Sequence, residues 1–434
     1  MGITFFFAWF DIGNIGTALP RVVEEFGVSK EAGATVVSLG LGGYIAGGLV
    51  GSVLADRFGR RVGFLFAVLF YGIGSLVNGL SGNIEVFSVF RFVSGMGIGA
   101  ALGVVSTYMS EIAPAKGRGR YMAWTTLPAL CGYAVVPILS LWLVPHVEIG
   151  WRLLLIVPMV GTVVFLSGFH LLPESPRWLA SRGRMEEANR IVTAAEERAA
   201  RLTGRSLAPV AAPAATSGKE GRSFLVVFSR KVLPWTILFF VLWTLNYIPI
   251  YGVGGMGVTL MTDHGVPLGK SIELTLGSSA GIILGGLVAP WVADRMPRKW
   301  PAFGVCLVLG TTLILLGFFP TNTMLAITFF VLGFQVGIFA PLVYLLTAEH
   351  FPTSGRATGI ALCNAVGHVG GAIAPILIVA VDASFGFGAT WSMLGILVFA
   401  LAAGLLLTRN TTGVSLESTT AESGPITAAP LAAN

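Results

Sequence analysis

Twelve apolar segments run through this chain, and each is long enough, or nearly so, to cross a bilayer core of about 30 Å as a helix of roughly 20 residues. A soluble core does not account for them. Hydrophobic residues make up 54% of the chain and charged residues 11%, whereas soluble domains average about 25% charged residues. The sequence therefore predicts an all-α membrane protein of twelve transmembrane helices. The expected spans are 3–20, 32–55, 62–81, 84–109, 120–143, 150–172, 233–262, 270–293, 300–319, 323–348, 358–381 and 387–408.

Several charged residues and glycines recur at one fixed offset of 238. The pairs are Asp56/Asp294, Arg57/Arg295, Arg60/Arg298, Glu111/Glu349, Pro114/Pro352, Arg118/Arg356, Gly95/Gly333 and Gly99/Gly337. Internal duplication of hydrophobic halves is typical of transporters that hold their substrate between the halves. The offset predicts two pseudo-symmetric six-helix bundles, over residues 1–172 and 233–408.

A long polar stretch, residues 173–232, separates the two expected bundles. Within it, Met185–Leu202 is rich in Ala, Glu and Arg and predicts an exposed amphipathic helix, and 208–221 is an Ala/Pro-rich linker. The tail, residues 409–434, is rich in Ser, Thr and Ala and is expected to be disordered.

The distribution of basic residues predicts the orientation in the membrane. If both termini and the 173–232 loop are cytoplasmic, 22 of the 27 Lys and Arg residues lie on the inner side. The net charge of +6 is then a topology signal, and no nucleic-acid partner is expected. We expect a monomeric, multi-pass protein of a bacterial-type inner membrane.

The start of the chain and its cysteines bear on processing and cofactors. The first apolar segment begins almost at Met1 without a basic leader, so we expect no signal peptide and a natural start further upstream. The three cysteines, Cys131, Cys306 and Cys363, lie in apolar runs, and their odd number and spacing fit neither a disulfide framework nor a metal site. No cofactor, metal or enzymatic activity is expected.

The loop after the second span reads GSVLADRFGRR from Gly51 to Arg61. This run resembles the signature G-x-x-x-D-R-x-G-R-R/K of the major facilitator superfamily, in which the glycine matched by Gly59 permits a tight turn. Ser52 stands where the signature has its first glycine. A second copy, ADRMPRK over residues 293–299, keeps the charges without the inner glycine. The alternative explanation is plain anchoring by positive charge.

Two further motifs resemble the sugar-porter branch of the same superfamily. The fourth span carries R-x-x-x-G-x-G-x-G from Arg91 to Gly99, and its exit carries Y-x-x-E-x-x-P-x-x-x-R-G from Tyr108. The sequence PESPRWL follows the sixth span, from Pro173 to Leu179. The resemblance covers essentially the full length and implies the twelve-helix major facilitator fold.

In this superfamily such charged residues form a cytoplasmic salt-bridge cluster that holds the outward-facing state and must break when the cytoplasmic side opens. Exposed pairs contribute about 0–1 kcal/mol each, but a partly buried network can bias an equilibrium of a few kcal/mol. The resemblance implies a gate made of Asp56, Arg57, Arg60, Arg61, Glu111, Arg118, Glu174, Arg177, Asp294, Arg295, Arg298, Glu349 and Arg356.

Two ionisable residues, Asp11 and Arg91, fall well inside expected spans. A lone charge at the bilayer centre costs at least about 3 kcal/mol, so such residues usually pair and usually serve function. In proton-coupled sugar-porter relatives, an aspartate of the first helix opposes the first arginine of the fourth-span signature, and Asp11 and Arg91 match these positions. The resemblance implies that Asp11 binds and releases the coupled proton under the control of Arg91. The alternatives are a static ion pair and a facilitator that retains the pair.

The expected substrate walls are aromatic and contain few polar groups. Hexose porters that share these signatures carry sugar-binding glutamines in spans five and seven, but 124–133 and 243–252 contain none. The run from Tyr344 to Gly359 instead resembles a branch of metabolite:proton symporters, organic-cation transporters and synaptic-vesicle glycoproteins, whose bacterial members carry nicotinate, aromatic acids or other small organic ions.

Candidate substrate contacts are the polar or aromatic residues near span midpoints: Asn14, Tyr108, Asn246, Tyr247, Tyr251, Gln335, Asn364 and His368. Most polar residues in membrane helices form interhelical hydrogen bonds instead. His368 is the sharpest candidate because imidazole titrates near neutral pH, so it can pair with an anionic substrate or join the proton route.

These features predict a secondary transporter that works by alternating access, coupling a proton to uptake of a small organic acid or aromatic metabolite. Proton-driven efflux of drugs or organic cations is the leading alternative, and sugar:proton symport is the third. A receptor without transport activity is a further alternative, against which the retained Asp11 and Arg91 argue.

Overall fold

Long apolar runs fold as helices in lipid because a helix satisfies its own backbone hydrogen bonds. The structure, a computed structural model, describes residues 1–113, 118–204, 223–293, 295–352 and 355–409. The first group of long helices is α1 (Gly2–Phe26), α2 (Lys30–Phe58), α3 (Arg60–Leu80), α4 (Ile84–Ile112), α5 (Arg118–Leu143) and α6 (Gly150–Gly168). The second group is α10 (Leu233–Asp263), α11 (Leu268–Ala293), α12 (Lys299–Phe318), α13 (Asn322–His350) and α14 (Arg356–Leu406).

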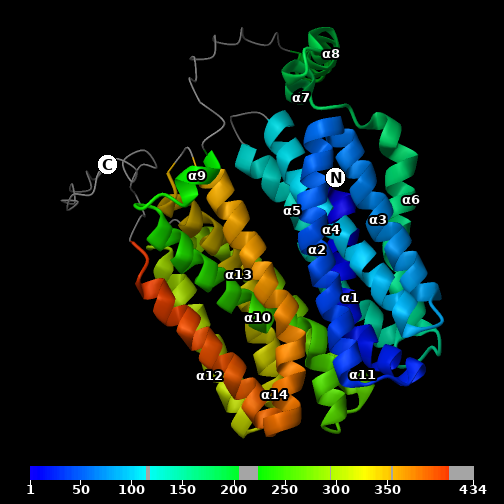
Figure 1. Cartoon of the computed structure of the whole chain (residues 1–434), viewed down its shortest axis with the longest axis vertical. Coiled ribbons are helices and arrows are strands. Elements are labelled where there is room, and N and C mark those ends of the chain that lie inside the picture. The colour runs from blue at the N-terminus through cyan, green and yellow to red at the C-terminus, as the bar shows by residue number, and fades with distance from the viewer. Residues whose placement is uncertain (114–117, 205–222, 294, 353–354, 410–434) are drawn as a thin grey trace.

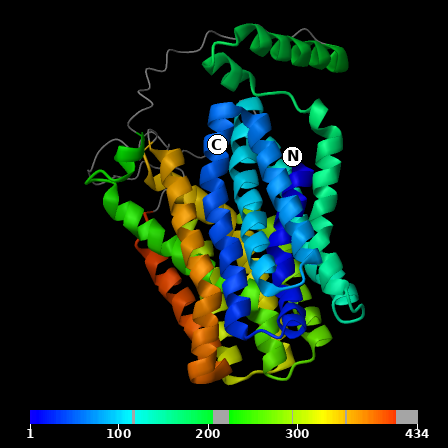
Figure 2. The same cartoon turned by 45° about the vertical axis from the view of Figure 1, so that its right-hand side comes forward.

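Short elements connect the two groups. They are the 3₁₀ turn η1 (Phe169–Leu171), α7 (Pro176–Ser181), α8 (Met185–Thr203) and α9 (Ser223–Val227). Figure 2 shows α8 beyond the end of the bundle, lying across the axes of the long helices. The predicted helix over Met185–Leu202 is thus confirmed.

Ten helices within the described residues are long and apolar enough to cross a membrane. One of them, α14, contains two expected spans, because Gly386 adopts φ 80° and ψ 178° and interrupts the helix between them. The apolar part of α5, Leu127–Leu143, is shorter than a usual span. Together these helices account for all twelve expected spans, and the prediction of an all-α membrane fold is confirmed.

Glycines let α2 and α4 approach one another closely. A Cβ atom at Gly95 would lie 2.0 Å from the carbonyl oxygen of Gly40, so no larger residue fits there. The equivalent residue of the second group, Gly333 of α13, makes the same contact with α11, where a Cβ atom would lie 2.0 Å from the Ser278 oxygen. The offset of 238 therefore marks a repeated packing interface.

The two groups, here called the N-half (α1–α6) and the C-half (α10–α14), face each other in Figure 1. They meet where α1 lies against α10, α2 against α14 and α5 against α11. We call the end of the molecule that carries the Asp56–Arg61 loop and α7 the motif end. The other end, which carries the α1–α2 and α10–α11 turns, is the opposite end.

The outer surfaces of the helices are apolar. Large side chains such as Leu49, Trp142 and Leu287 are 67%, 74% and 71% exposed. Large apolar side chains exposed to this extent are expected of a surface that contacts lipid rather than water.

Candidate functional site

Asp11 and Arg91 meet in the interior of the N-half. The Asp11 side chain is fully buried, and that of Arg91 is 5% exposed. The Arg91 guanidinium donates from Nη1 to Asp11 Oδ1 at 3.2 Å and from Nη2 to the Asp11 carbonyl at 2.9 Å. Asn14, one helical turn further along α1, donates its amide to the same Oδ1 at 3.1 Å. The structure thus brings together two residues that the sequence separates by 80 positions.

A glycine of α2 makes room for this pair. A Cβ atom at Gly40 would lie 3.1 Å from Arg91 Nε, so the guanidinium lies directly against the α2 backbone. Arg91 Nε and Asp11 Oδ2 have no hydrogen-bond partner among the described residues. The buried pair therefore has one donor and one acceptor atom that can still form a hydrogen bond.

A second cluster joins the two halves near the middle of α2. The ring of Tyr44 from α2 stacks on the imidazole of His368 from α14, with centroids 4.2 Å apart and planes 16° apart. The Tyr251 hydroxyl lies 3.0 Å from His368 Nε2, and His368 Nδ1 donates to the Asn364 carbonyl at 2.8 Å. With Nδ1 protonated, Nε2 accepts from Tyr251, so the arrangement fits a neutral imidazole.

Tyr247 extends this aromatic cluster. Its hydroxyl donates to Asn364 Oδ1 at 2.7 Å, and its ring meets that of His368 edge-on at 4.5 Å. Four predicted substrate residues, Tyr247, Tyr251, Asn364 and His368, therefore lie together. Sequence reasoning missed Tyr44, which lies in a glycine-rich stretch of α2 where the polar ring was its only signal.

The other predicted substrate residues lie apart from this cluster. Gln335 donates to Asn246 at 2.8 Å within the C-half, and both side chains are buried. Asn14 belongs to the Asp11 site. Tyr108, expected near a span midpoint, lies near the motif end of α4, where its hydroxyl donates to the Pro173 carbonyl at 2.7 Å. Tyr108 therefore does not share a site with the other candidates.

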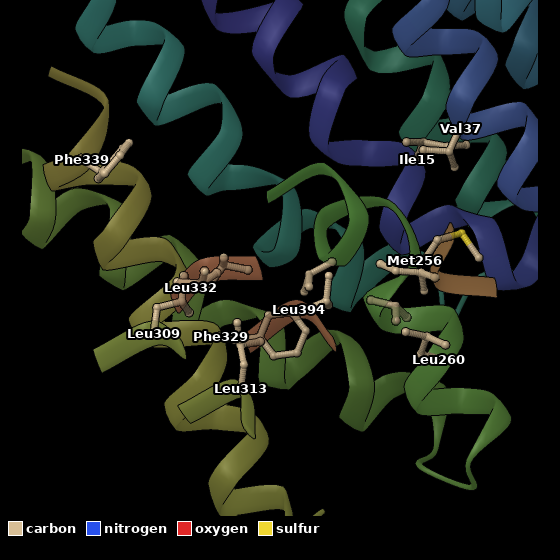
Figure 3. Close-up of a cluster of buried hydrophobic side chains, with 14 of the residues drawn as sticks. Ile15, Val37, Met256, Leu260, Leu309, Leu313, Phe329, Leu332, Phe339 and Leu394 are labelled. Atoms are coloured by element: carbon tan, nitrogen blue, oxygen red, sulfur yellow. The ribbon is translucent and has the colours of Figure 1, made fainter. Parts of the chain in front are cut away.

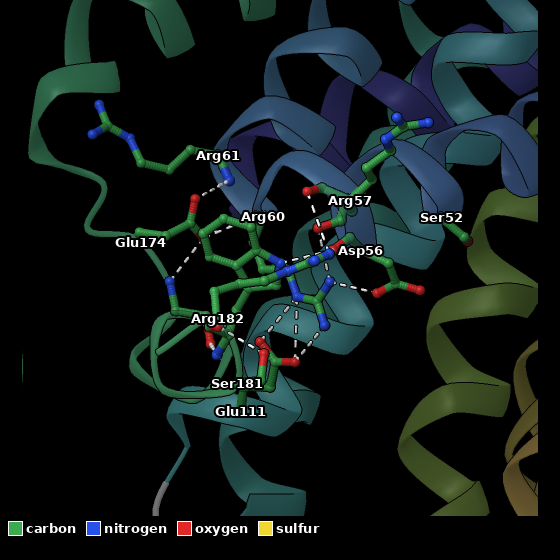
Figure 4. Close-up of polar contacts among 12 residues, drawn as sticks. Ser52, Asp56, Arg57, Arg60, Arg61, Glu111, Glu174, Ser181 and Arg182 are labelled. Atoms are coloured by element: carbon green, nitrogen blue, oxygen red, sulfur yellow. Dashed lines mark hydrogen bonds and ion pairs between the residues drawn. The ribbon is translucent and has the colours of Figure 1, made fainter. Parts of the chain in front are cut away.

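Several of the predicted gate residues of the N-half form one network at the motif end (Figure 4). Arg60 donates to Glu111 from Nη2 at 2.7 Å and from Nε at 3.1 Å, and to Asp56 at 2.5 Å. Burial opposes ionisation of Glu111, but hydrogen bonds from Arg60 and Ser175 outweigh it and lower the pKa of this carboxyl.

Glu174, in the segment between η1 and α7, completes the same network. It accepts from the backbone N–H groups of Arg60 and Arg61 at 2.8 and 3.2 Å. A Cβ atom at Gly59, whose φ is 108°, would lie 2.4 Å from Glu174 Oε2. The glycine of the motif is therefore required both by the backbone angle and by the approaching carboxylate.

The remaining gate residues contribute less directly. The guanidinium of Arg57 lies over the Phe58 ring, that of Arg61 over Phe169, and that of Arg295 over Trp291. In the C-half Arg298 pairs with Glu349, and Arg356 donates to the Ala348 carbonyl. Arg177 favours ionisation of Glu111 through its charge. Asp294 and the side chain of Arg118 lie outside the described residues.

The halves contact each other mainly toward the opposite end. A Cβ atom at Gly16 of α1 would lie 1.8 Å from the Gly254 oxygen of α10. Lys30 of α2 pairs with Asp263 of α10 at 2.9 Å. The ion pairs described above for the motif end each stay within one half. This arrangement is closed at the opposite end.

Comparison with known proteins identifies this architecture. The family described as "Sugar (and other) transporter" matches residues 2–422. The chain belongs to this family. It is a membrane transporter of small molecules and not an enzyme, and it lies in the metabolite-transporter branch of the family.

Three bacterial proteins are among the relatives of this chain. A putative metabolite transport protein, YyaJ of Bacillus subtilis, is 26% identical over 91% of this chain and 87% of that protein. The niacin transporter NiaP of Acinetobacter baylyi is 27% identical over 96% and 94%. The 4-hydroxybenzoate transporter PcaK of the same organism is 28% identical over 83% and 79%.

Solved structures of the family share the fold. The xylose transporter XylE of Escherichia coli in an inward-open conformation superposes with a TM-score of 0.75 at 18% identity, covering 96% of this chain and 97% of that one. A D-xylose-proton symporter gives a TM-score of 0.74 at 19% identity, with 95% and 97% covered. The major facilitator fold predicted from the motifs is confirmed.

Proposed function

We propose that this transporter couples the movement of a proton to the uptake of a small aromatic acid. The observation that carries the proposal is the buried Asp11–Arg91 pair. A carboxylate with no exposed surface needs a cation beside it, and neutralising it with a proton weakens that pairing. The protonation state of Asp11 can therefore bias which conformation the two halves adopt.

The aromatic cluster supports an aromatic substrate. Tyr44 belongs to one half and His368 to the other, and their rings already stack. A planar substrate ring can occupy the position of one of these rings when the halves separate, and its polar group can meet the Tyr251 hydroxyl and His368 Nε2 in place of their mutual hydrogen bond. Relatives named for niacin, 4-hydroxybenzoate and gallate transport the same kind of molecule.

The orientation proposed here has both termini and the motif end in the cytoplasm. The closed opposite end and the separate ion-pair networks of the two halves then describe an inward-facing conformation. Alternating access requires the Lys30–Asp263 and Gly16–Gly254 contacts to break when the outside opens.

Purified protein in vesicles with an internal pH indicator tests this function. Adding 4-hydroxybenzoate, nicotinate or gallate outside should acidify the lumen as proton and substrate enter together. Alkalinisation would indicate antiport, and xylose and tetraethylammonium serve as the sugar and cation alternatives. No pH change with any of these compounds would contradict proton coupling.

Substitutions test whether Asp11 is the residue that carries the coupled proton. Asp11→Asn should abolish uphill accumulation and spare exchange of labelled for unlabelled substrate, because the neutral amide mimics a permanently protonated carboxyl. Glu24→Gln, on the same helix with an exposed side chain, is the matched control and should accumulate normally. Full accumulation by Asp11→Asn would end the coupling proposal.

A further inference from the structure

One face of α3 carries buried polar groups that the fold leaves unbonded. Tyr71, Ser75 and Asn78 are each 0% exposed. The Ser75 hydroxyl and both amide atoms of Asn78 have no hydrogen-bond partner among the described residues. The Tyr71 hydroxyl interacts with that of Thr162, which donates to the Val68 carbonyl at 2.9 Å, and has no other partner among the described residues. Buried polar groups are almost always hydrogen-bonded, and where protein partners are missing, internal water is the usual partner.

This face points toward the helix that carries Asp11. Gly74 packs on Ser94 of α4, whereas Gly72 and Gly79 pack on α6. At 100° per residue, positions 71, 75 and 78 fall between these two edges, toward the interior of the N-half. The Tyr71 hydroxyl is close enough to Asp11 to interact with its charge.

Unbonded polar atoms continue from α3 to the carboxylate itself. Asp11 Oδ2, Asn14 Oδ1 and Arg91 Nε also lack partners among the described residues. Because Asp11 is fully buried, its proton cannot come directly from the space between the halves in this conformation. An internal route is needed.

The buried polar residues of α3 continue toward the opposite end of the molecule and not toward the motif end. Toward the motif end, the same side of α3 is formed by Phe64, Ala67 and Val68, all 0% exposed and apolar. Toward the opposite end it reaches Asn78, near the end of the helix. There Arg152 of α6 donates to the carbonyl oxygens of Gly79 and Ser81 at 3.1 and 2.6 Å.

The duplicated half shows that packing does not require these polar groups. The offset of 238 also relates Gly72 to Gly310 and Gly79 to Gly317, so α3 and α12 share one register. At the places of Tyr71, Ser75 and Asn78, α12 carries Leu309, Leu313 and Leu316, all of them buried. Figure 3 shows Leu309 and Leu313 in a purely hydrophobic cluster.

We propose that Tyr71, Ser75, Asn78 and Asn14 line a file of internal water that carries the coupled proton between the opposite end of the N-half and Asp11, apart from the path of the substrate. This inference rests on the proposed role of Asp11. A hydronium ion at the Asn78 end gives up one proton, which passes along the hydrogen-bonded file to Asp11 Oδ2. The hydronium becomes water, and the carboxylate becomes a carboxyl.

Charged groups at both ends control this file. Arg91 of α4 and Tyr71 of α3 face Asp11. Arg152 of α6 lies at the other end, paired with Glu25 of α1 at 2.5 Å. The positive charge of Arg152 limits proton entry, and the apolar Phe64–Val68 face prevents leakage to the motif end.

Asn78→Leu, which installs the residue of the C-half, tests the file in vesicles. Uptake driven by a pH gradient should slow and lose its dependence on pH at the opposite end, while exchange of labelled for unlabelled substrate at equal pH continues. Asn78→Ser keeps a polar group and should restore coupled uptake. Ser75→Ala removes one hydroxyl with little change in packing and should slow coupled uptake less than Asn78→Leu.

Three outcomes would overturn the file. Unchanged coupled uptake in Asn78→Leu and Ser75→Ala would show that the proton enters elsewhere. Loss of exchange in both variants would show that these α3 residues serve packing rather than proton transfer. Coupled uptake as slow in Asn78→Ser as in Asn78→Leu would show that polarity at this position is not the cause. These results are distinct from failure of the proposed function, in which Asp11→Asn itself accumulates substrate.

Discussion

The N-half and the C-half share a backbone register, but their interiors differ at the positions that surround Asp11. The positions of Asp11, Asn14 and Arg91 in the N-half correspond to Pro249, Gly252 and Phe329 in the C-half. Phe329 belongs to a cluster of buried hydrophobic side chains that includes Leu309, Leu313 and Leu394 (Figure 3). The N-half buries an ion pair and several unbonded polar atoms in the equivalent space.

This difference distinguishes the residues that the fold requires from the residues that serve transport. Both halves need the close glycine contacts, Gly95 in one and Gly333 in the other, so these are conditions of the fold. At the positions of Asp11 and Arg91 the C-half carries the uncharged residues Pro249 and Phe329, and burying polar groups without full pairing costs stability. Because the C-half packs with apolar residues at these positions, the polar groups that the N-half carries there indicate a role in transport.

Removing the buried cation should have the largest effect. Arg91→Leu leaves Asp11 without its partner, which costs about 3–5 kcal/mol when a buried pair is broken or is relieved by permanent protonation of the carboxyl. Either way uphill accumulation should be lost. Thermal unfolding and substrate accumulation measure the two consequences.

The double variant Asp11→Asn/Arg91→Leu should recover most of the lost stability without recovering accumulation. Phe329→Leu, at the equivalent position of the C-half, is the matched control and should keep coupling. A double variant as unstable as Arg91→Leu alone would argue that Arg91 acts through packing rather than charge.

Placing a polar residue of the N-half at the equivalent C-half position should lower stability without affecting proton coupling. Leu316→Asn buries an amide in an apolar cluster, which costs about 1–3 kcal/mol for an unpaired polar group and adds lost packing. We expect a lower unfolding temperature and unchanged proton coupling. If coupling changed as in Asn78→Leu, the two interiors would not have separate roles.

The sequence predicted the fold well because its signals are local. The twelve apolar runs and the Gly59 turn each depend on neighbouring residues, and the 238-residue offset can be read directly from the sequence. The Asp11–Arg91 contact, 80 positions apart, was predicted only because the motif of α4 resembles that of proton-coupled relatives. The outcome for α14, one helix interrupted at Gly386, needed the backbone angles.

The substrate cluster was predicted only in part, because its geometry depends on how the halves meet. Tyr44 and His368 are 324 positions apart in the printed sequence, and neither lies in a motif that relates them. Tyr108 was wrongly grouped with the mid-span residues, although the predicted span 84–109 already places it at the end of α4, where its hydroxyl meets the Pro173 carbonyl. The α3 face gave no sequence signal until the register of α12 was available for comparison.

The glycines where the halves meet should respond unequally, although the offset relates them. A Cβ atom at Gly16 would overlap the Gly254 oxygen at 1.8 Å, whereas a Cβ atom at Gly254 would meet only the Tyr133 hydroxyl at 3.2 Å. Gly16→Ala should therefore disfavour the closed opposite end by about 1–3 kcal/mol, the usual cost of overpacking, and Gly254→Ala should not. Distances between spin labels at Glu31 and Lys270 would lengthen only in the first variant, and equal distances in both would contradict this interface.

The smallest expected effect concerns the motif end of the N-half. The pKa of Glu111 is lowered because hydrogen bonds from Arg60 and Ser175 outweigh burial. A lowered carboxyl pKa stabilises the fold at neutral pH, and this stabilisation is lost as the pH falls below the ordinary glutamate pKa of about 4.3 and through the lowered value. Glu111→Gln should thus have a lower free energy of unfolding than the parent at pH 7, by about 1.5 kcal/mol, the lower end of the range for hydrogen bonds to a charged group. Its unfolding temperature should be lower too, and the two proteins should converge in acid. Glu187→Gln removes an exposed partner of Arg184 and serves as the surface control, with no change expected because such pairs contribute little. A gap for Glu111→Gln that does not narrow as the pH falls well below the ordinary glutamate pKa would mean that the N-half network depends on shape rather than on charge.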